Sequence, residues 1–329
     1  MFRSRIFVTW FISALIVWGV LFHEYCGLEF LRTHLYYPLI MVLGAFVAGM
    51  TPEGGGAVAF PALSLFFEIS REWARDFSLM IQSIGMTSAS LFILTHPQTD
   101  RRVFRPLFWL TPFACLGFLA GMQWLQGLSV VAIHLVFLSL ITAFALSYAL
   151  HARRGQRELL QLRTGTDFLL CVATAFTGGI AASLFGTGAD ILMYTLVVTR
   201  FGLAEKTATR LSVVLMTCVS LAGFSWRHFV DADLQPEQYQ GWLCAWPVVL
   251  FMAPFGAWVL QRIHVEWMIR GLVILNSLQL IYFNLREPSL ARVLVSLILT
   301  LLLFMVFRWG VRNSGGERKA AEQAERGSC

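Results

Sequence analysis

The stretch GMTPEGGGAVAFP, Gly49–Pro61, lies inside an apolar run that extends from residue 36 to residue 68. Three consecutive glycines between two prolines disfavour an α-helix, and Glu53 places a carboxylate beside this break. An unbroken helix over the whole run would measure roughly 50 Å, against a membrane core of about 30 Å. The stretch therefore predicts a helix–break–helix hairpin that enters and leaves a bilayer on the same side.

Composition indicates that the whole chain is a membrane protein. Of its 329 residues, 57% are hydrophobic and only 13% are charged. A soluble domain cannot bury that much apolar surface, whereas a polytopic membrane protein can. The net charge of +6 comes from short basic clusters between apolar runs, which is typical of topology signals. The cluster Arg153–Arg163 links two spans and contains no aromatic residue, so no nucleic-acid partner is expected.

Apolar runs recur along the chain, and eight of them have ordinary spanning length. A second long run, 168–201, is interrupted at FGTGAD, Phe185–Asp190, and predicts a second hairpin. The first run, 6–22, follows two arginines but lacks a cleavage site of small residues, so we expect an uncleaved helix rather than a signal peptide. The other runs of ordinary length are 77–96, 107–126, 129–150, 211–230, 241–261, 267–285 and 293–309.

The distribution of Lys and Arg favours the two hairpins. With a cytoplasmic N-terminus and both long runs as hairpins, 19 of the 25 basic residues lie on the cytoplasmic side. If both long runs crossed fully, the split would be 14 to 11. Cytoplasmic loops of membrane proteins are enriched in Lys and Arg, so the hairpin topology is expected, with both termini in the cytoplasm.

The two halves of the chain resemble each other at a nearly constant offset. Gly54 and Gly56 match Gly186 and Gly188 at an offset of 132. Further matches, at offsets of 134 and 135, pair Ala74 with Ala208, Ser78 with Ser212, Pro112 with Pro247, and Gly121 with Gly256. Each unit is then one hairpin plus three spans, and because three crossings is an odd number, the two units are inverted relative to each other.

The expected fold is an all-α polytopic membrane protein: an inverted repeat of a re-entrant helical hairpin plus three spanning helices, with one extra helix at each end. The expected divisions are an anchor helix with its external loop at 1–35, repeat 1 at 36–150, a basic cytoplasmic linker at 151–167, repeat 2 at 168–285, an extra spanning helix at 286–310 and a polar cytoplasmic tail at 311–329.

The two breaks mark the candidate binding site. Irregular backbone at membrane depth is tolerated only where protein buries it or where it lines a wet cavity. Each second hairpin arm begins just after its break, and the partial positive charge of two helix N-termini suits an anion. The candidate substrate-binding residues are Gly54, Gly55, Gly56, Ala57, Gln82, Ser83, Thr87, Gly186, Thr187, Gly188, Thr217 and Ser220. For the hydroxyl groups, the alternative is hydrogen bonding across packed helices or to their own backbone.

Two carboxylates, Glu53 and Asp190, flank the breaks. Intramembrane carboxylates are costly and are therefore functional candidates, here as carriers of a coupling proton. Either one could instead cap the exposed amides of the following helix arm. Both interpretations stay open for both residues.

The chain resembles the sulfite exporter TauE/SafE family over roughly residues 40–285. The resemblance rests on GAFVAGMTPEGGGAVAFPALSLFF with ARDFSLMIQSIGMTS, and on FTGGIAASLFGTGADILMY with ATRLSVVLMTCVSLAG. It implies a secondary transporter that moves sulfite, organosulfonates or related sulfur-containing or carboxylate anions across the bacterial cytoplasmic membrane by alternating access, with export as the expected direction. The second break departs from the family pattern at Ala189, Asp190 and Met193, where small residues or proline are usual.

Enzymatic classes lack support in the sequence. The sequence contains no Ser–His–Asp pattern, metal-spaced cluster or phosphate-binding loop, so no catalytic residue, metal or cofactor is expected. The expected partners are a small anion, protons as the coupling ion and the lipid bilayer. Uptake of the same anions and a non-transporting scaffold role are the alternatives, and a homodimer is left open.

Overall fold

The computed structural model describes residues 4–150, 156–162, 164–286 and 288–326, with the backbone alone from residue 309 onward. Parts of the expected linker (151–155 and 163) and the last three residues of the expected tail lie outside the described residues. Within the described ranges, the regular structure is helical apart from one isolated bridge between Arg157 and Leu203.

The described chain forms thirteen α-helices. They are α1 (Arg5–Tyr25), α2 (Gly27–Thr33), α3 (Tyr36–Met50), α4 (Gly56–Pro61), α5 (Arg71–Thr95), α6 (Leu107–Trp124), α7 (Val130–Ala149), α8 (Gly165–Phe185), α9 (Ala189–Thr199), α10 (Glu205–Trp226), α11 (Pro236–Leu260), α12 (Val265–Arg286) and α13 (Leu290–Arg326). Three shorter elements are the π-helices η1 (Ala62–Phe66) and η3 (Arg227–Asp231) and the 3₁₀-helix η2 (Arg101–Phe104).

Nine helices in the described chain are long and apolar enough to cross a membrane, so the protein is a polytopic membrane protein. Eight of them correspond to the eight runs of ordinary length. The ninth is α8, which was expected as a hairpin arm but has 21 residues and is long enough to cross by itself. In the first long run, by contrast, the helix before the break is shorter than a span: α3 has 15 residues, and it is bent by 74° relative to α2.

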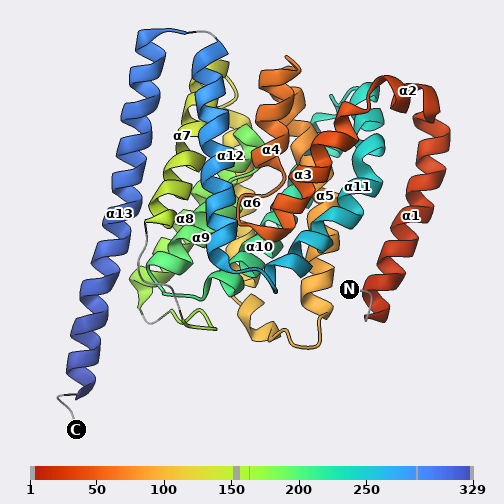
Figure 1. Cartoon of the computed structure of the whole chain (residues 1–329). Coiled ribbons are helices and arrows are strands. Elements are labelled where there is room, and N and C mark those ends of the chain that lie inside the picture. The colour runs from red at the N-terminus through yellow and green to blue at the C-terminus, as the bar shows by residue number, and fades with distance from the viewer. Residues whose placement is uncertain (1–3, 151–155, 163, 287, 327–329) are drawn as a thin grey trace.

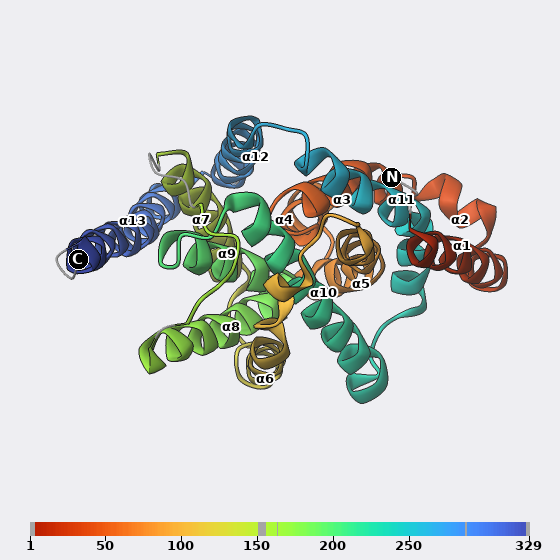
Figure 2. The same ribbon diagram turned by 90° about the horizontal axis from the view of Figure 1, so that it is seen from below.

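Both long apolar runs are broken where the sequence predicts. α3 ends at Met50, and α4 begins at Gly56. α8 ends at Phe185, and α9 begins at Ala189. Figure 1 shows α3 running from one end of the molecule to its middle and α4 returning toward that end, whereas α8 and α9 do the same from the opposite end. The first and last helices, α1 and α13, lie at opposite edges of the bundle (Figure 2).

Two helix pairs approach each other closely through glycine. α3 packs against α11, and a Cβ atom at Gly49 would lie 1.8 Å from the carbonyl oxygen of Ala253. α8 packs against α6, where a Cβ atom at Gly179 would lie 1.9 Å from the carbonyl oxygen of Ala114. Small residues allow this kind of backbone contact between membrane helices. The first helix of each expected repeat therefore packs most closely on a helix of the other repeat.

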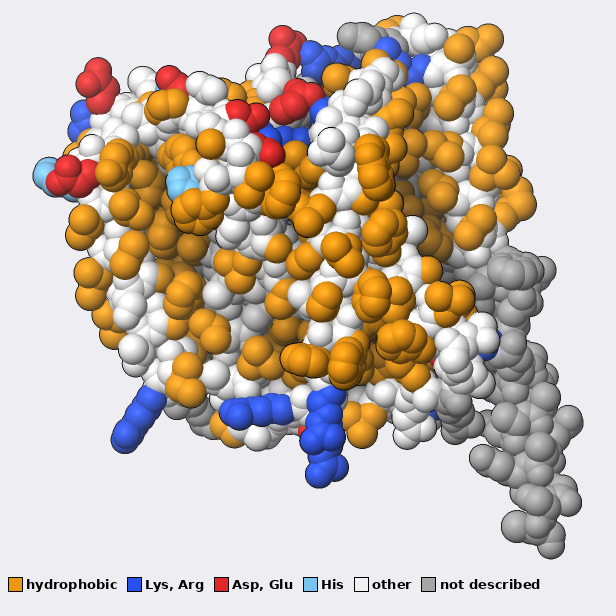
Figure 3. Space-filling model, turned by 180° about the vertical axis from the view of Figure 1, so that it is seen from behind, with side chains coloured by type: hydrophobic (Ala, Val, Ile, Leu, Met, Phe, Trp, Pro, Cys, Tyr) orange, Lys and Arg blue, Asp and Glu red, His pale blue; other side chains and the backbone are white. Residues whose placement is uncertain are grey.

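The surface matches a membrane environment. Figure 3 shows hydrophobic side chains across the middle of one face, with Lys and Arg side chains at the lower end and both acidic and basic side chains at the upper end. On α13 several leucines are exposed, for example Leu297 at 58% and Leu301 at 54%. An apolar band flanked by charged ends is the pattern of a protein whose sides face lipid.

Candidate functional site

The two breaks meet each other in the middle of the molecule. Thr187 in the second break donates a hydrogen bond from Oγ1 to the backbone oxygen of Glu53 in the first, at 2.9 Å. These two residues are 134 positions apart in the chain and are both fully buried. The contact brings the two Gly-rich stretches, predicted separately from the sequence, into a single polar centre.

Glycine is required at three positions of this centre, Gly54, Gly186 and Gly188, by a positive φ and by close neighbours. Gly54 has a φ of +68°, and a Cβ atom there would lie 2.5 Å from Asp190 Oδ2, 2.7 Å from Thr187 Oγ1 and 2.9 Å from Gln82 Oε1. Gly186 has a φ of +76°. The middle glycine of the triplet is different, because Gly55 has a φ of −69° and a Cβ atom there would make ordinary contacts at 3.6 Å.

Gln82 of α5 connects the two breaks. Its Nε2 donates to the backbone oxygen of Gly186 at 2.6 Å and to that of Ser78 at 2.9 Å. Both acceptors are carbonyls, so the amide orientation is fixed and Oε1 turns the other way, toward Gly54. This Oε1 atom is buried and has no hydrogen-bond partner.

Asp190 has the geometry of a helix cap. Its Oδ1 accepts hydrogen bonds from the backbone amides of Gly188 and Ile191, both at 3.0 Å, at the start of α9. These amides have no partner within the helix, so a carboxylate there satisfies them and interacts favourably with the helix dipole. The capping interpretation therefore describes the observed contacts of Asp190.

Glu53 has a different environment. No side chain caps α4, and the Glu53 carboxylate instead accepts a hydrogen bond at Oε1 from Nδ2 of Asn276 on α12, at 2.7 Å. Its second oxygen, Oε2, is buried without a partner. Glu53 is thus a fully buried acid with one free oxygen, in contact with a helix that lies more than 200 residues later in the chain.

Helix α12 contributes two amides to the centre. Besides Glu53, Asn276 Nδ2 donates to the backbone oxygen of Ile141 at 3.0 Å. Gln279 Nε2 donates to the backbone oxygen of Ala57 at 3.1 Å. Through this oxygen the candidate residue Ala57 takes part in the centre. Sequence reasoning missed Gln279. The signal that could have found it is the pair of amides three residues apart in the apolar run 267–285, which places both on one helix face.

The candidate hydroxyl residues bond mainly within their own helices. Ser83, Thr87 and Ser220 donate to the carbonyls of Met80, Ser83 and Met216. Thr217 donates to the carbonyl of Val213 and also meets Ser90 across the α5–α10 contact, at 2.7 Å between the oxygens. In this conformation these four hydroxyls bond to their own backbone or across packed helices, as the alternative interpretation has it. Among the polar residues proposed to bind substrate, only Gln82 and Thr187 form hydrogen bonds between the breaks or to them.

Four buried oxygens around the breaks lack a hydrogen-bond partner. They are Glu53 Oε2, Gln82 Oε1, Asn276 Oδ1 and Gln279 Oε1. Unpaired buried acceptors are costly, at about 1–3 kcal/mol each, so the centre is built to receive hydrogen-bond donors. A protonated carboxyl, a protonated cargo or water can supply them. Among the described residues, no group of three or more His, Cys, Asp or Glu could hold a metal ion.

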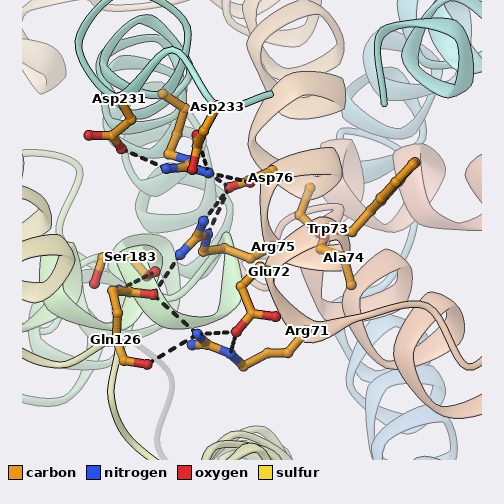
Figure 4. A network of polar contacts seen from close by, with 12 residues as sticks. Arg71, Glu72, Trp73, Ala74, Arg75, Asp76, Gln126, Ser183, Asp231 and Asp233 are labelled. Atoms are coloured by element: carbon orange, nitrogen blue, oxygen red, sulfur yellow. Dashed lines mark hydrogen bonds and ion pairs between the residues drawn. The ribbon is translucent and has the colours of Figure 1, made fainter. Parts of the chain in front are cut away.

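A charged network lies at the start of α5, near η3 (Figure 4). Asp76 is 2% exposed and accepts from Arg75 at 2.7 Å and from Arg227 at 2.9 Å. Arg227 also pairs with Asp231 and Asp233, both at 2.7 Å. The network therefore joins α5, from the first expected repeat, to η3, from the second.

Gln126, in the connection between α6 and α7, extends this network. Its Oε1 accepts from Nη1 of Arg75 at 2.6 Å and from Nη2 of Arg71 at 3.3 Å. Its Nε2 donates to the backbone oxygen of Ser183 on α8, at 3.2 Å. Figure 4 shows the Arg75 and Arg71 guanidinium groups turned toward Gln126. The network thus connects α5 to the helix that leads into the second break.

Comparison with known proteins agrees with this geometry. No similar curated protein and no similar solved structure was found. The model of the family described as sulfite exporter TauE/SafE matches residues 37–283, from the start of α3 to near the end of α12, and so includes both breaks and all four oxygens without a partner. The chain therefore belongs to the sulfite exporter TauE/SafE family, whose members are membrane transporters rather than enzymes.

Proposed function

We propose that this protein moves a small anion, sulfite or an organosulfonate, across the bacterial cytoplasmic membrane by alternating access. The observation that carries the proposal is the contact between the two breaks, in which Thr187 donates to the Glu53 backbone oxygen. Irregular backbone at membrane depth belongs to ligand sites in transporters built from inverted repeats. The cargo would bind at this centre, and the helices on either side would rearrange around it.

An inverted repeat is supported by the pattern of helix contacts. Exchanging the two units turns the α3–α11 contact into α8–α6, α4–α5 into α9–α10, and α5–α11 into α10–α6, all of which occur. The contacts α5–α10 and α7–α12 map onto themselves. The orientation proposed here, with both termini cytoplasmic, follows from the Lys and Arg distribution.

Glu53 is the residue that we propose carries a coupling proton. Asp190 is occupied by two backbone amides, whereas Glu53 keeps one oxygen free beside the breaks. Burial without full pairing disfavours a charged carboxylate, and an anion nearby disfavours it further. Cargo binding and protonation of Glu53 would therefore support each other, and release of the proton would favour release of the anion.

The proposed direction is export, in which the negative interior of a cell drives the anion outward against the inward driving force on the proton that is bound with it. Uptake through the same site is the second candidate, and the four acceptor oxygens favour it, because they favour a cargo that is bound together with a proton. An inward proton gradient drives such co-movement inward.

Flux measurements in proteoliposomes test the proposal. We expect labelled sulfite or a small sulfonate to cross vesicles that contain the protein and to respond to an imposed pH gradient. Glu53→Gln should lose the response to the gradient and retain exchange at equal pH, whereas Glu29→Gln, an exposed control on α2, should behave as wild type. If no anion in a panel of sulfur and carboxylate anions crosses faster than in empty vesicles, the proposal is wrong.

A further inference from the structure

Helix α1 lies outside the part of the chain that matches the family and packs along α11. Two hydrogen bonds hold the pair together. Trp18 donates from Nε1 to the backbone oxygen of Leu243 at 2.8 Å, and Gln240 donates from Nε2 to the backbone oxygen of Tyr25 at 2.9 Å. The C-terminal part of α1 is therefore fixed against the first turns of α11.

Two cysteines face each other at this contact. Cys26, directly after α1, has its Sγ 3.5 Å from Sγ of Cys244 on α11. Forming a disulfide requires the two sulfurs to approach by about 1.5 Å, to roughly 2.05 Å. Rotation of the two side chains can bring the sulfurs together, because the hydrogen bonds of Trp18 and Gln240 hold the two backbones beside each other. We propose that Cys26 and Cys244 form a disulfide that fastens α1 to α11.

The side of the membrane on which the two cysteines lie supports the proposed disulfide. Cys26 lies between α1 and α2, at the end of the molecule opposite the start of α1 and the end of α13 (Figure 1). In the proposed orientation, which this inference requires, that end faces the outside of the cytoplasmic membrane. Disulfides form and persist there, whereas the cytoplasm keeps thiols reduced.

The two thiols differ in solvent exposure, and this difference determines which thiol reacts first with an external oxidant. Cys26 is half-buried, and Cys244 is 3% exposed. The thiolate of Cys26 attacks the disulfide of an external dithiol–disulfide oxidant, forming a mixed disulfide and releasing one oxidant thiol. The thiolate of Cys244 then attacks Sγ of Cys26 and displaces the second oxidant thiol. Two electrons and two protons leave with the reduced oxidant.

Counting free thiols tests the disulfide. The protein is denatured in the presence of N-ethylmaleimide, so that every free thiol is blocked, and is then reduced and reacted with a maleimide that adds mass. Two of the six cysteines should acquire the mass only after reduction. Cys26→Ser and Cys244→Ser should each abolish these two additions, whereas Cys115→Ser should leave them unchanged. Peptide mapping without reduction should recover the Cys26–Cys244 cross-link.

The same variants test whether the disulfide stabilises the folded protein. Reduction should lower the melting temperature of the wild-type protein by several degrees and leave that of Cys26→Ser unchanged. If no cysteine of the wild-type protein needs reduction before it reacts with the maleimide, or if two cysteines still need it in Cys26→Ser, the proposal is overturned.

Discussion

Replacing Asp76 with Asn removes the negative charge between two guanidinium groups. Asp76 is 2% exposed and contacts Arg75 and Arg227 at 2.7–3.1 Å. The asparagine is similar in size and keeps one acceptor oxygen, so the packing changes little. The two arginines would lose their shared counter-charge, and Arg75, itself 2% exposed, cannot move its charge into water.

The expected cost is that of breaking a buried ion pair, about 3–5 kcal/mol. Asp233→Asn is the matched control, because Asp233 contacts the same Arg227 at 2.7 Å but is 57% exposed. An exposed pair contributes about 0–1 kcal/mol. With about 2 °C of melting temperature per kcal/mol for a large domain, Asp76→Asn should melt roughly 6–10 °C lower and Asp233→Asn within about 2 °C of wild type. Thermal unfolding of the purified protein in detergent measures both shifts.

A double variant makes the test sharper. In Asp76→Asn the cation left without a carboxylate partner is Arg75, because Arg227 still pairs with Asp231 and Asp233. Combining Asp76→Asn with Arg75→Gln removes that cation, so the loss of stability should be smaller than the sum of the two single losses by about 1 kcal/mol or more. Equal melting shifts for Asp76→Asn and Asp233→Asn, or strictly additive losses in the double variant, would refute the argument that Asp76 holds buried charges together.

The remaining predictions concern the breaks and the topology. Gly54→Ala should abolish flux, because Gly54 has a φ of +68° and a Cβ atom would lie 2.5 Å from Asp190 Oδ2, whereas Gly55→Ala should retain flux; similar flux in both variants would contradict this. Asp190→Asn can still accept the two amides of the cap, so flux driven by a pH gradient should survive, and its loss in a correctly inserted protein would make Asp190 the coupling residue. In a variant without native cysteines, Ser70→Cys should react with an impermeant maleimide from outside the cell; labelling only from the cytoplasm would contradict the hairpin topology.

The breaks themselves could be predicted from local sequence. Two apolar runs of more than 30 residues are too long for one span, and the glycines near their middles indicate where each helix ends. The helix ends at Met50 and Phe185 agree with these positions. Length alone could not predict that α8 would be a complete span-length helix, because the sequence does not show how far each arm extends from its break.

The partners of the central residues depend on tertiary structure. Nothing near Glu53 in the sequence indicates that Asn276 would approach it, because that contact is created by the packing of α12. The serines and threonines of α5 and α10 are a different case. Their residue type suits an anion site, but a hydroxyl can always bond to the carbonyl one turn earlier, and most of them do so here.

The close contact of Gly49 with Ala253 has a consequence for synthesis on the ribosome. The two residues are separated by about 200 positions, so at about 5–20 residues per second α11 is made roughly 10–40 s after α3. During that interval the α11 helix that packs on the glycine face of α3 has not yet been made. The hydrogen bond from Asn276 to Glu53 forms later still, because Asn276 lies on α12. The nascent first half must therefore be sheltered by lipid or by an insertion factor, and an isolated N-terminal half ending before α11 should be recognised and degraded rather than accumulate as a stable domain.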